Sequence, residues 1–134
     1  MAIVDHSGIP LALFVTCAKP HKSQFVEETL RQRHIKDKPI RMVGDKAYDS
    51  DPLDARLAKR HRIEVIAPNK SNRKRRTQDG RSLRRYRGRW RVERFLAWLQ
   101  SQRRLIIRYE YYDWIFQSLV QLAAVLILFK FLGK

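Results

Sequence analysis

The chain has few cysteines and few acidic residues. Its single cysteine, Cys17, cannot form a disulfide within the chain, and no Cys/His spacing resembles a zinc site. A reducing cytoplasm is therefore the expected compartment. Asp and Glu together number 13 against 29 Lys and Arg, which leaves a net charge of +16 over 134 residues. This excess is larger than solubility requires and predicts a polyanionic partner.

The sequence also lacks a long uninterrupted apolar run. The nearest approach is residues 114–132, where two glutamines, a serine and Lys130 interrupt the apolar pattern and leave an unbroken run of eight residues, Leu122–Phe129. A spanning helix needs about 20 apolar residues. We therefore expect residues 114–132 to form a buried helix of the domain core and expect no membrane partner.

Length and patterning predict one α/β domain. A hydrophobic content of 44% over 134 residues suits a single core. The expected elements are a hairpin of two strands within residues 2–18, a helix over 23–34, a strand ending at Gly44, a helix over 52–61 with Asp51 as N-cap, and a strand over 63–68. Strands that alternate with helices are typical of a sheet with crossover helices.

The positive charge is concentrated in one segment. From Asn69 to Arg104 there are fourteen Lys or Arg and two acids, so +12 of the net +16 lies within 36 residues. Residues 69–82 have no periodicity, which predicts a mobile loop that a bound polyanion orders. The candidate DNA contacts in this loop are Lys70, Arg73, Lys74, Arg75 and Arg76.

A long helix is predicted over residues 86–104. Its buried stripe is expected to consist of Val92, Phe95, Leu96 and Leu99. At 100° per residue, Arg89, Glu93 and Gln100 fall within about 40° of each other on the flank of that stripe. Glu93 has two interpretations, a local ion pair that relieves repulsion on a basic helix, or a ligand for a metal ion.

Asp45 is the second isolated carboxylate. It directly follows a core strand, where α/β sheets place their ligand-binding and catalytic groups. Carboxylates from a strand end and a facing helix can share a divalent metal, and the basic surroundings would attract phosphate. Asp45 can also be a simple turn residue after Gly44. We interpret Asp49 and Asp51 as structural residues of the loop and cap that follow.

Four segments carry a resemblance to a known family. They read MVGDKAYDSDPL, VIAPNKSNRKRR, YRGRWRVERFLAWLQSQRRLIIRYE and FQSLVQLAAVLIL. Together they resemble the DDE transposases of bacterial insertion sequences, in the branch with a Tyr-x2-Arg-x3-Glu-x6-Lys signature. Tyr86, Arg89 and Glu93 match this signature in type and spacing, whereas Gln100 stands in place of its lysine.

The resemblance implies a ribonuclease-H-like fold, a mixed sheet flanked by helices, in which three acids bind two Mg²⁺ ions, with Mn²⁺ as an alternative. By matching position, Asp45 is expected to be the second acid and Glu93 the third, at a site that cuts and joins DNA phosphodiesters. Tyr86 and Arg89 are expected to contact the phosphates of transposon ends. Gln100 keeps a hydrogen-bonding group at the last signature position but adds no charge there.

The resemblance further implies that residues 1–134 form part of a catalytic domain without its first strand and first acid. Asp5 is the nearest acid, and its place before a turn indicates a structural role. An upstream transposase segment or the full-length transposase would supply the missing part in a bacterial cytoplasm. We expect the isolated chain to be inactive and the full-length protein to be a homo-oligomer.

Other hypotheses remain open. A non-catalytic basic module, or the remnant of a decayed transposase, would bind DNA through residues 69–104 without metal and lose affinity steeply with salt. An RNA-binding protein would explain the charge equally well, but it gives no purpose to Asp45 and Glu93, and the sequence has no evident RNA-recognition motif.

Overall fold

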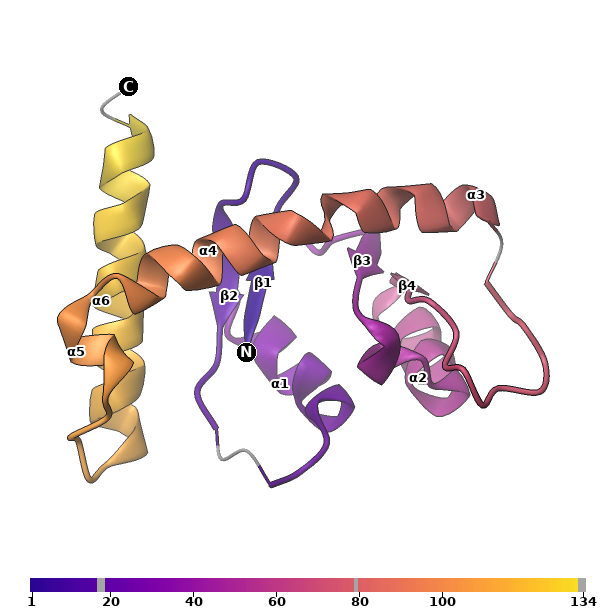
Figure 1. Ribbon diagram of the computed structural model, residues 1–134, viewed down its shortest axis with the longest axis horizontal. Coiled ribbons are helices and arrows are strands. Elements are labelled where there is room, and N and C mark those ends of the chain that lie inside the picture. The colour runs from indigo at the N-terminus through magenta and orange to yellow at the C-terminus, as the bar shows by residue number, and fades with distance from the viewer. Residues whose placement is uncertain (17–18, 79, 133–134) are drawn as a thin grey trace.

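The first two strands form a hairpin. The computed structural model describes residues 1–16, 19–78 and 80–132 (Figure 1). Strand β1 (Ala2–Val4) pairs antiparallel with β2 (Pro10–Leu13). Gly8 in the turn has a φ of 89°, a conformation that glycine adopts without steric cost. The predicted hairpin is confirmed, while Cys17 at its expected end lies outside the described residues.

The next strands form the predicted strand–helix–strand unit. Strand β3 (Arg41–Val43) pairs parallel with β4 (Glu64–Ile66), and α2 (Asp51–His61) connects them. The N-cap of α2 is Ser50, so the prediction of Asp51 is wrong by one residue. Pro52 lies in the first turn of α2, where its missing N–H is no loss. The 3-10 helix η2 (Lys46–Tyr48) lies between β3 and α2.

The four strands of the described residues make two separate two-stranded sheets, with the orders β1-β2 and β3-β4. This differs from the single mixed sheet that the sequence predicted. Within the described part of the chain, β1 and β3 are each paired along one edge. Both nevertheless contribute to one apolar cluster, because Ile3 of β1 and Met42 of β3 pack against it. The buried members of that cluster are Val26, Leu30, Leu53, Leu57 and Ile63.

The helix after the hairpin is shorter than predicted. A 3-10 turn, η1 (Lys22–Phe25), leads into α1 (Val26–Arg31), whereas the sequence pattern extended to residue 34. The hydroxyl of Thr29 donates to the carbonyl oxygen of Phe25 at 2.8 Å, so this buried polar group is satisfied within the helical turn. The buried face of α1 contributes Val26 and Leu30 to the apolar cluster that packs against both strand pairs.

A row of helical segments bridges the two sheets. In chain order they are α3 (Gly80–Leu83), η3 (Arg84–Arg89), α4 (Trp90–Gln100) and α5 (Arg103–Ile106). Figure 1 shows the row passing from the β3-β4 pair to the hairpin, and contacts of η3 with β3 and of α4 with β1 support this arrangement. The helix predicted over residues 86–104 is present as α4 from Trp90 to Gln100, whereas residues 86–89 belong to the 3-10 helix η3 and a break after Gln100 separates α4 from α5.

The second apolar cluster joins the hairpin, α4 and the last helix, α6 (Asp113–Leu132). Phe95 is fully buried there and Leu99 nearly so. Leu96, by contrast, is 42% exposed, so its predicted place in the stripe is wrong. The stripe of α4 is completed instead by Trp98, which packs against the cluster at the edge of α6.

Helix α6 has the predicted bounds but a different environment from the predicted core helix. Its buried residues are Ala123, Ala124 and Ile127, while Leu122, Phe129 and Leu132 are more than half exposed. Its most apolar 18-residue window has a mean hydropathy of 2.0 and is 22% buried, so by length and composition alone the helix could cross a membrane. Core helices of soluble proteins can have the same length and composition. The prediction that this helix is buried is wrong for the described part of the chain, because much of its apolar surface is exposed.

Candidate functional site

Asp45 lies where the chain leaves β3. One of its carboxylate oxygens accepts a hydrogen bond from the amide of Ala47 at 2.9 Å and thereby caps η2. The side chain is partly exposed, and its negative charge adds to burial in raising the pKa of the Tyr48 hydroxyl. Asp45 therefore occupies the predicted strand-end position while also serving as the turn residue of the alternative interpretation.

Glu93 lies in the first turn of α4 and forms an ion pair with Arg89, one helical turn earlier. The side chain of Glu93 is 55% exposed, and ion pairs of this kind on a helix surface contribute about 0.3–0.5 kcal/mol. The local ion pair predicted as one alternative is thus present. A pair this weak can exchange for another ligand at small cost.

Three of the four signature residues lie together. The guanidinium of Arg89 lies 5.5 Å from the centroid of the Tyr86 ring and pairs with Glu93. The fourth, Gln100, is the exposed last residue of α4. The arginine is therefore held between an aromatic face and a carboxylate, with part of its side chain accessible to solvent.

The carboxylates do not assemble into a metal centre within this structure. Asp45 is bonded to its own turn and Glu93 to its own helix, and these two environments share no hydrogen-bonding residue among those described. In residues 1–16, 19–78 and 80–132, no three His, Cys, Asp or Glu side chains are grouped so that they could hold a metal ion. The implied two-metal site is therefore incomplete here.

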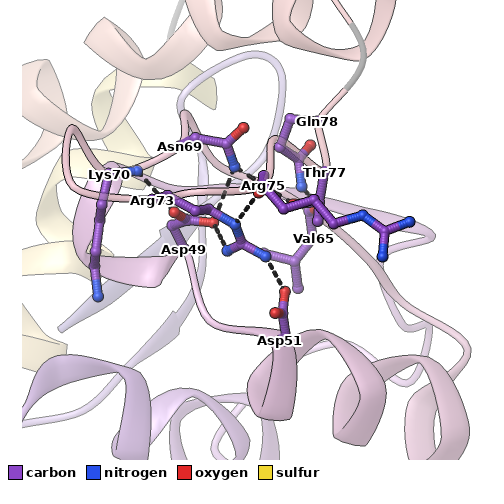
Figure 2. A network of polar contacts seen from close by, with 9 residues as sticks. All are labelled: Asp49, Asp51, Val65, Asn69, Lys70, Arg73, Arg75, Thr77 and Gln78. Carbon is purple, nitrogen blue, oxygen red and sulfur yellow. Dashed lines mark hydrogen bonds and ion pairs between the residues drawn. The ribbon is translucent and has the colours of Figure 1, made fainter.

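The basic loop, residues 69–78, is anchored to a buried carboxylate (Figure 2). Asp49, whose side chain is 1% exposed, accepts hydrogen bonds from the side chain of Asn69 at 3.2 Å and the amide of Lys70 at 2.7 Å. It also pairs with the guanidinium of Arg73, which reaches Asp51 at the start of α2. The expectation of a mobile loop without fixed contacts is therefore wrong for its first half.

The other candidate cations of this loop face solvent. Arg73 is the exception, with a side chain that is 15% exposed. Figure 2 shows the side chains of Lys70 and Arg75 extending away from the network around Asp49. The exposed cations are Lys70, Lys74, Arg75 and Arg76. We call these four residues the loop cations.

The electrostatics of this region centre on three aspartates. Burial, followed by the charges of Asp51 and Asp49, raises the pKa of Asp54 to about 6, against the opposing effect of Arg73. A hydrogen bond to Asp51 is the main cause that raises the pKa of Arg73. A hollow of about 730 Å³ lies beside these groups, lined by Asp49, Ser50, Asp51, Arg73, Arg75, Arg76 and Thr77.

Sequence reasoning missed the partnership between Asp49 and the loop. Asp49 and Arg73 are separated by 24 residues, and no helical or strand periodicity relates them. Two runs of opposite charge could have indicated this contact, the acidic residues around Asp49 and the basic residues after Pro68. They follow β3 and β4, which are neighbouring parallel strands. Such strands end at the same edge of a sheet, which brings the runs together.

Comparison with known proteins identifies the family. The sequence model of the family described as Transposase DDE domain matches residues 1–128. The chain therefore belongs to the DDE transposase family, and the resemblance seen in the sequence is confirmed at that level.

A similar protein supports the same family and shows how much of a transposase the chain covers. A protein of Burkholderia cepacia assigned as the transposase for insertion sequence element IS402 is 34% identical over 116 residues, which cover 81% of this chain and 51% of the relative. The chain thus spans about half the length of that relative. No solved structure matches the chain.

Proposed function

We propose that the chain is the C-terminal part of a DDE transposase catalytic domain, which cleaves transposon ends and joins them to target DNA. The observation that carries the proposal is the family match over residues 1–128. Asp45 and Glu93 are two of the acids in this proposal, and Mg²⁺ or Mn²⁺ is the cofactor. In this proposal the third acid comes from a further segment of the transposase.

A ribonuclease-H-like sheet is part of the same proposal. The two strand pairs support it, because among the described residues β1 and β3 each have an unpaired edge and contact a shared apolar cluster through Ile3 and Met42. An additional strand between β1 and β3 would join both pairs into one mixed sheet. An upstream transposase segment, or the full-length transposase, is the proposed source, and the isolated chain is inactive.

The proposed DNA surface combines the loop cations with the signature residues on η3 and α4. Arg89 can exchange its exposed carboxylate partner for a phosphate at small cost, since both groups accept the same bidentate hydrogen bonds. Tyr86 and Gln100 add neutral hydrogen-bonding groups. The full-length protein acts as a homo-oligomer on chromosomal DNA in the bacterial cytoplasm.

The test is strand cleavage of a labelled transposon end with Mg²⁺, comparing this chain with a version extended upstream. The extended form is expected to cut, and Glu93→Gln to abolish cutting. Glu64→Gln is the matched control, because Glu64 is also a glutamate about half exposed and paired with an arginine, Arg41. Cutting by the Glu93→Gln variant would contradict the assigned role.

A non-catalytic DNA-binding module is the second candidate. It is favoured by the ion pair that occupies Glu93 and by the incomplete group of acids. Under this alternative, neither form of the chain cuts DNA, both bind it without metal, and Asp45→Ala leaves the affinity unchanged. Binding that depends on Mg²⁺ and on Asp45 would exclude it.

A further inference from the structure

We propose that Arg73 is a positioning residue that fastens the basic loop to the turn carrying Asp45, so that the loop cations face a nucleic-acid backbone. This deepens the proposed DNA interface and rests on it. The sequence alone grouped Arg73 with the DNA contacts. Its contacts in the structure assign it a different task.

The guanidinium of Arg73 has little capacity left for a phosphate. Its two terminal nitrogens donate to Asp49 and Asp51, and Nε donates to the carbonyl oxygen of Arg75 at 2.8 Å. All three nitrogens are thus engaged, and two carboxylates neutralise the charge. Neutralising DNA phosphate requires a cation whose charge is not already compensated.

Arg73 also stabilises the buried carboxylate of Asp49. A carboxylate that is 1% exposed has lost its water and is stable only when charged or polar donors replace it. Among the described residues, the donors to this carboxylate all belong to the start of the loop, namely Asn69, Lys70 and Arg73. Removing Arg73 leaves a buried anion without its cation, and the loop start is then expected to detach.

The anchored loop is joined to the candidate catalytic turn through covalent and hydrogen bonds. Asp49 is the C-cap of η2, where its amide donates to the carbonyl oxygen of Lys46 at 3.3 Å. Asp45 is the N-cap of the same short helix. A DNA strand bound by the loop cations would therefore be held at a defined position relative to Asp45, because the loop and Asp45 are both attached to η2.

Anchoring also determines which way the cations point. A free segment with this many like charges would extend and repel itself. In the structure the side chain of Arg75 projects outward while its carbonyl oxygen is held by Arg73 (Figure 2). Preorganised cations bind a polyanion without the entropic cost of ordering the loop.

The experiment compares Arg73→Lys with Arg31→Lys in the whole chain, both of which keep the net charge. A lysine cannot bridge Asp49 and Asp51, because it presents a point charge where arginine presents a planar fork. Affinity for a DNA duplex is measured by fluorescence anisotropy over a salt series. Arg73→Lys is expected to weaken binding about three- to tenfold. Arg31→Lys changes an exposed arginine that pairs with Glu28 on α1, outside the proposed DNA surface, and is expected to bind like the unaltered chain.

Amide hydrogen exchange without DNA gives the second readout. The amide of Lys70, which donates to Asp49, is expected to exchange at least about tenfold faster in Arg73→Lys. Protection of α4 in the same samples checks that the domain stays folded. Unchanged exchange at Lys70 together with unchanged affinity would overturn the proposal. If even the unaltered chain fails to bind DNA, the proposed function fails, and the exchange of Lys70 alone decides whether Arg73 anchors the loop.

Discussion

The pKa of Asp54 is raised by burial and by the negative charges of neighbouring aspartates. Its pKa is raised from 3.8 to about 6, and its buried oxygen Oδ1 has no hydrogen-bond partner among the described residues. Between these two pH values the folded chain holds a proton that the unfolded chain has released. Stability therefore falls as pH rises through this range, and the full cost is present above pH 6.

Replacing Asp54 by asparagine is expected to remove this pH dependence. The gain in the free energy of unfolding of Asp54→Asn over the unaltered chain should be larger at pH 7.5 than at pH 4, by roughly 1 kcal/mol. One pKa unit corresponds to about 1.4 kcal/mol, and partial solvent exposure reduces the effect. Urea unfolding at both pH values measures it, with Asp37→Asn as an exposed control. A gain that is equal at both pH values would contradict the assignment.

At the level of residues, the sequence predicted local pairs better than distant ones. Glu93 and Arg89 are one helical turn apart, so periodicity alone placed them on one flank, and the structure contains their ion pair. Asp49 and Arg73 meet only because the chain returns after β4. Their contact depends on tertiary structure, which a residue pattern does not encode.

At the level of elements, the sequence pattern predicted the position of α6 but not which of its faces is buried. Its bounds followed from a run of apolar residues, but that run is apolar all around the helix and therefore does not indicate which face is buried. In the structure the small residues Ala123 and Ala124 allow the helix to approach α4 and the hairpin, and Ile127 fills the cluster with Leu13 and Phe95. Leu122, Leu126 and Phe129 remain exposed.

Truncation of α6 residues tests this orientation. Ile127→Ala is expected to lower the free energy of unfolding by about 2–4 kcal/mol, because it opens a cavity where the side chain is 4% exposed. Phe129→Ala removes a larger side chain that is 64% exposed, and is expected to cost less than about 1 kcal/mol. Urea unfolding compares them. A larger loss for Phe129→Ala would mean that α6 packs through its other face.

At the level of the whole molecule, the positions of the described strands and longer helices were predicted, but their division into two separate sheets was not. Strand positions follow from local composition, whereas joining β1 to β3 needs backbone partners for both edges. Within the described residues those edges have no strand between them, although the apolar cluster beneath is shared. The positions of the strands were therefore predicted, whereas the single sheet was not found among the described residues.

The proposed additional strand makes a measurable difference to both edges at once. In a chain extended upstream, backbone amides of β1 and β3 that face away from β2 and β4 are expected to exchange at least about tenfold more slowly, because they gain hydrogen bonds. Amides that already bond across β1-β2 and β3-β4 serve as the internal reference. Slower exchange at Ala2 and Val43 together, whose amides face away from β2 and β4, would indicate one strand between the two pairs. Slower exchange in only one sheet would place the upstream segment on an outer surface and remove the main support for a ribonuclease-H-like sheet.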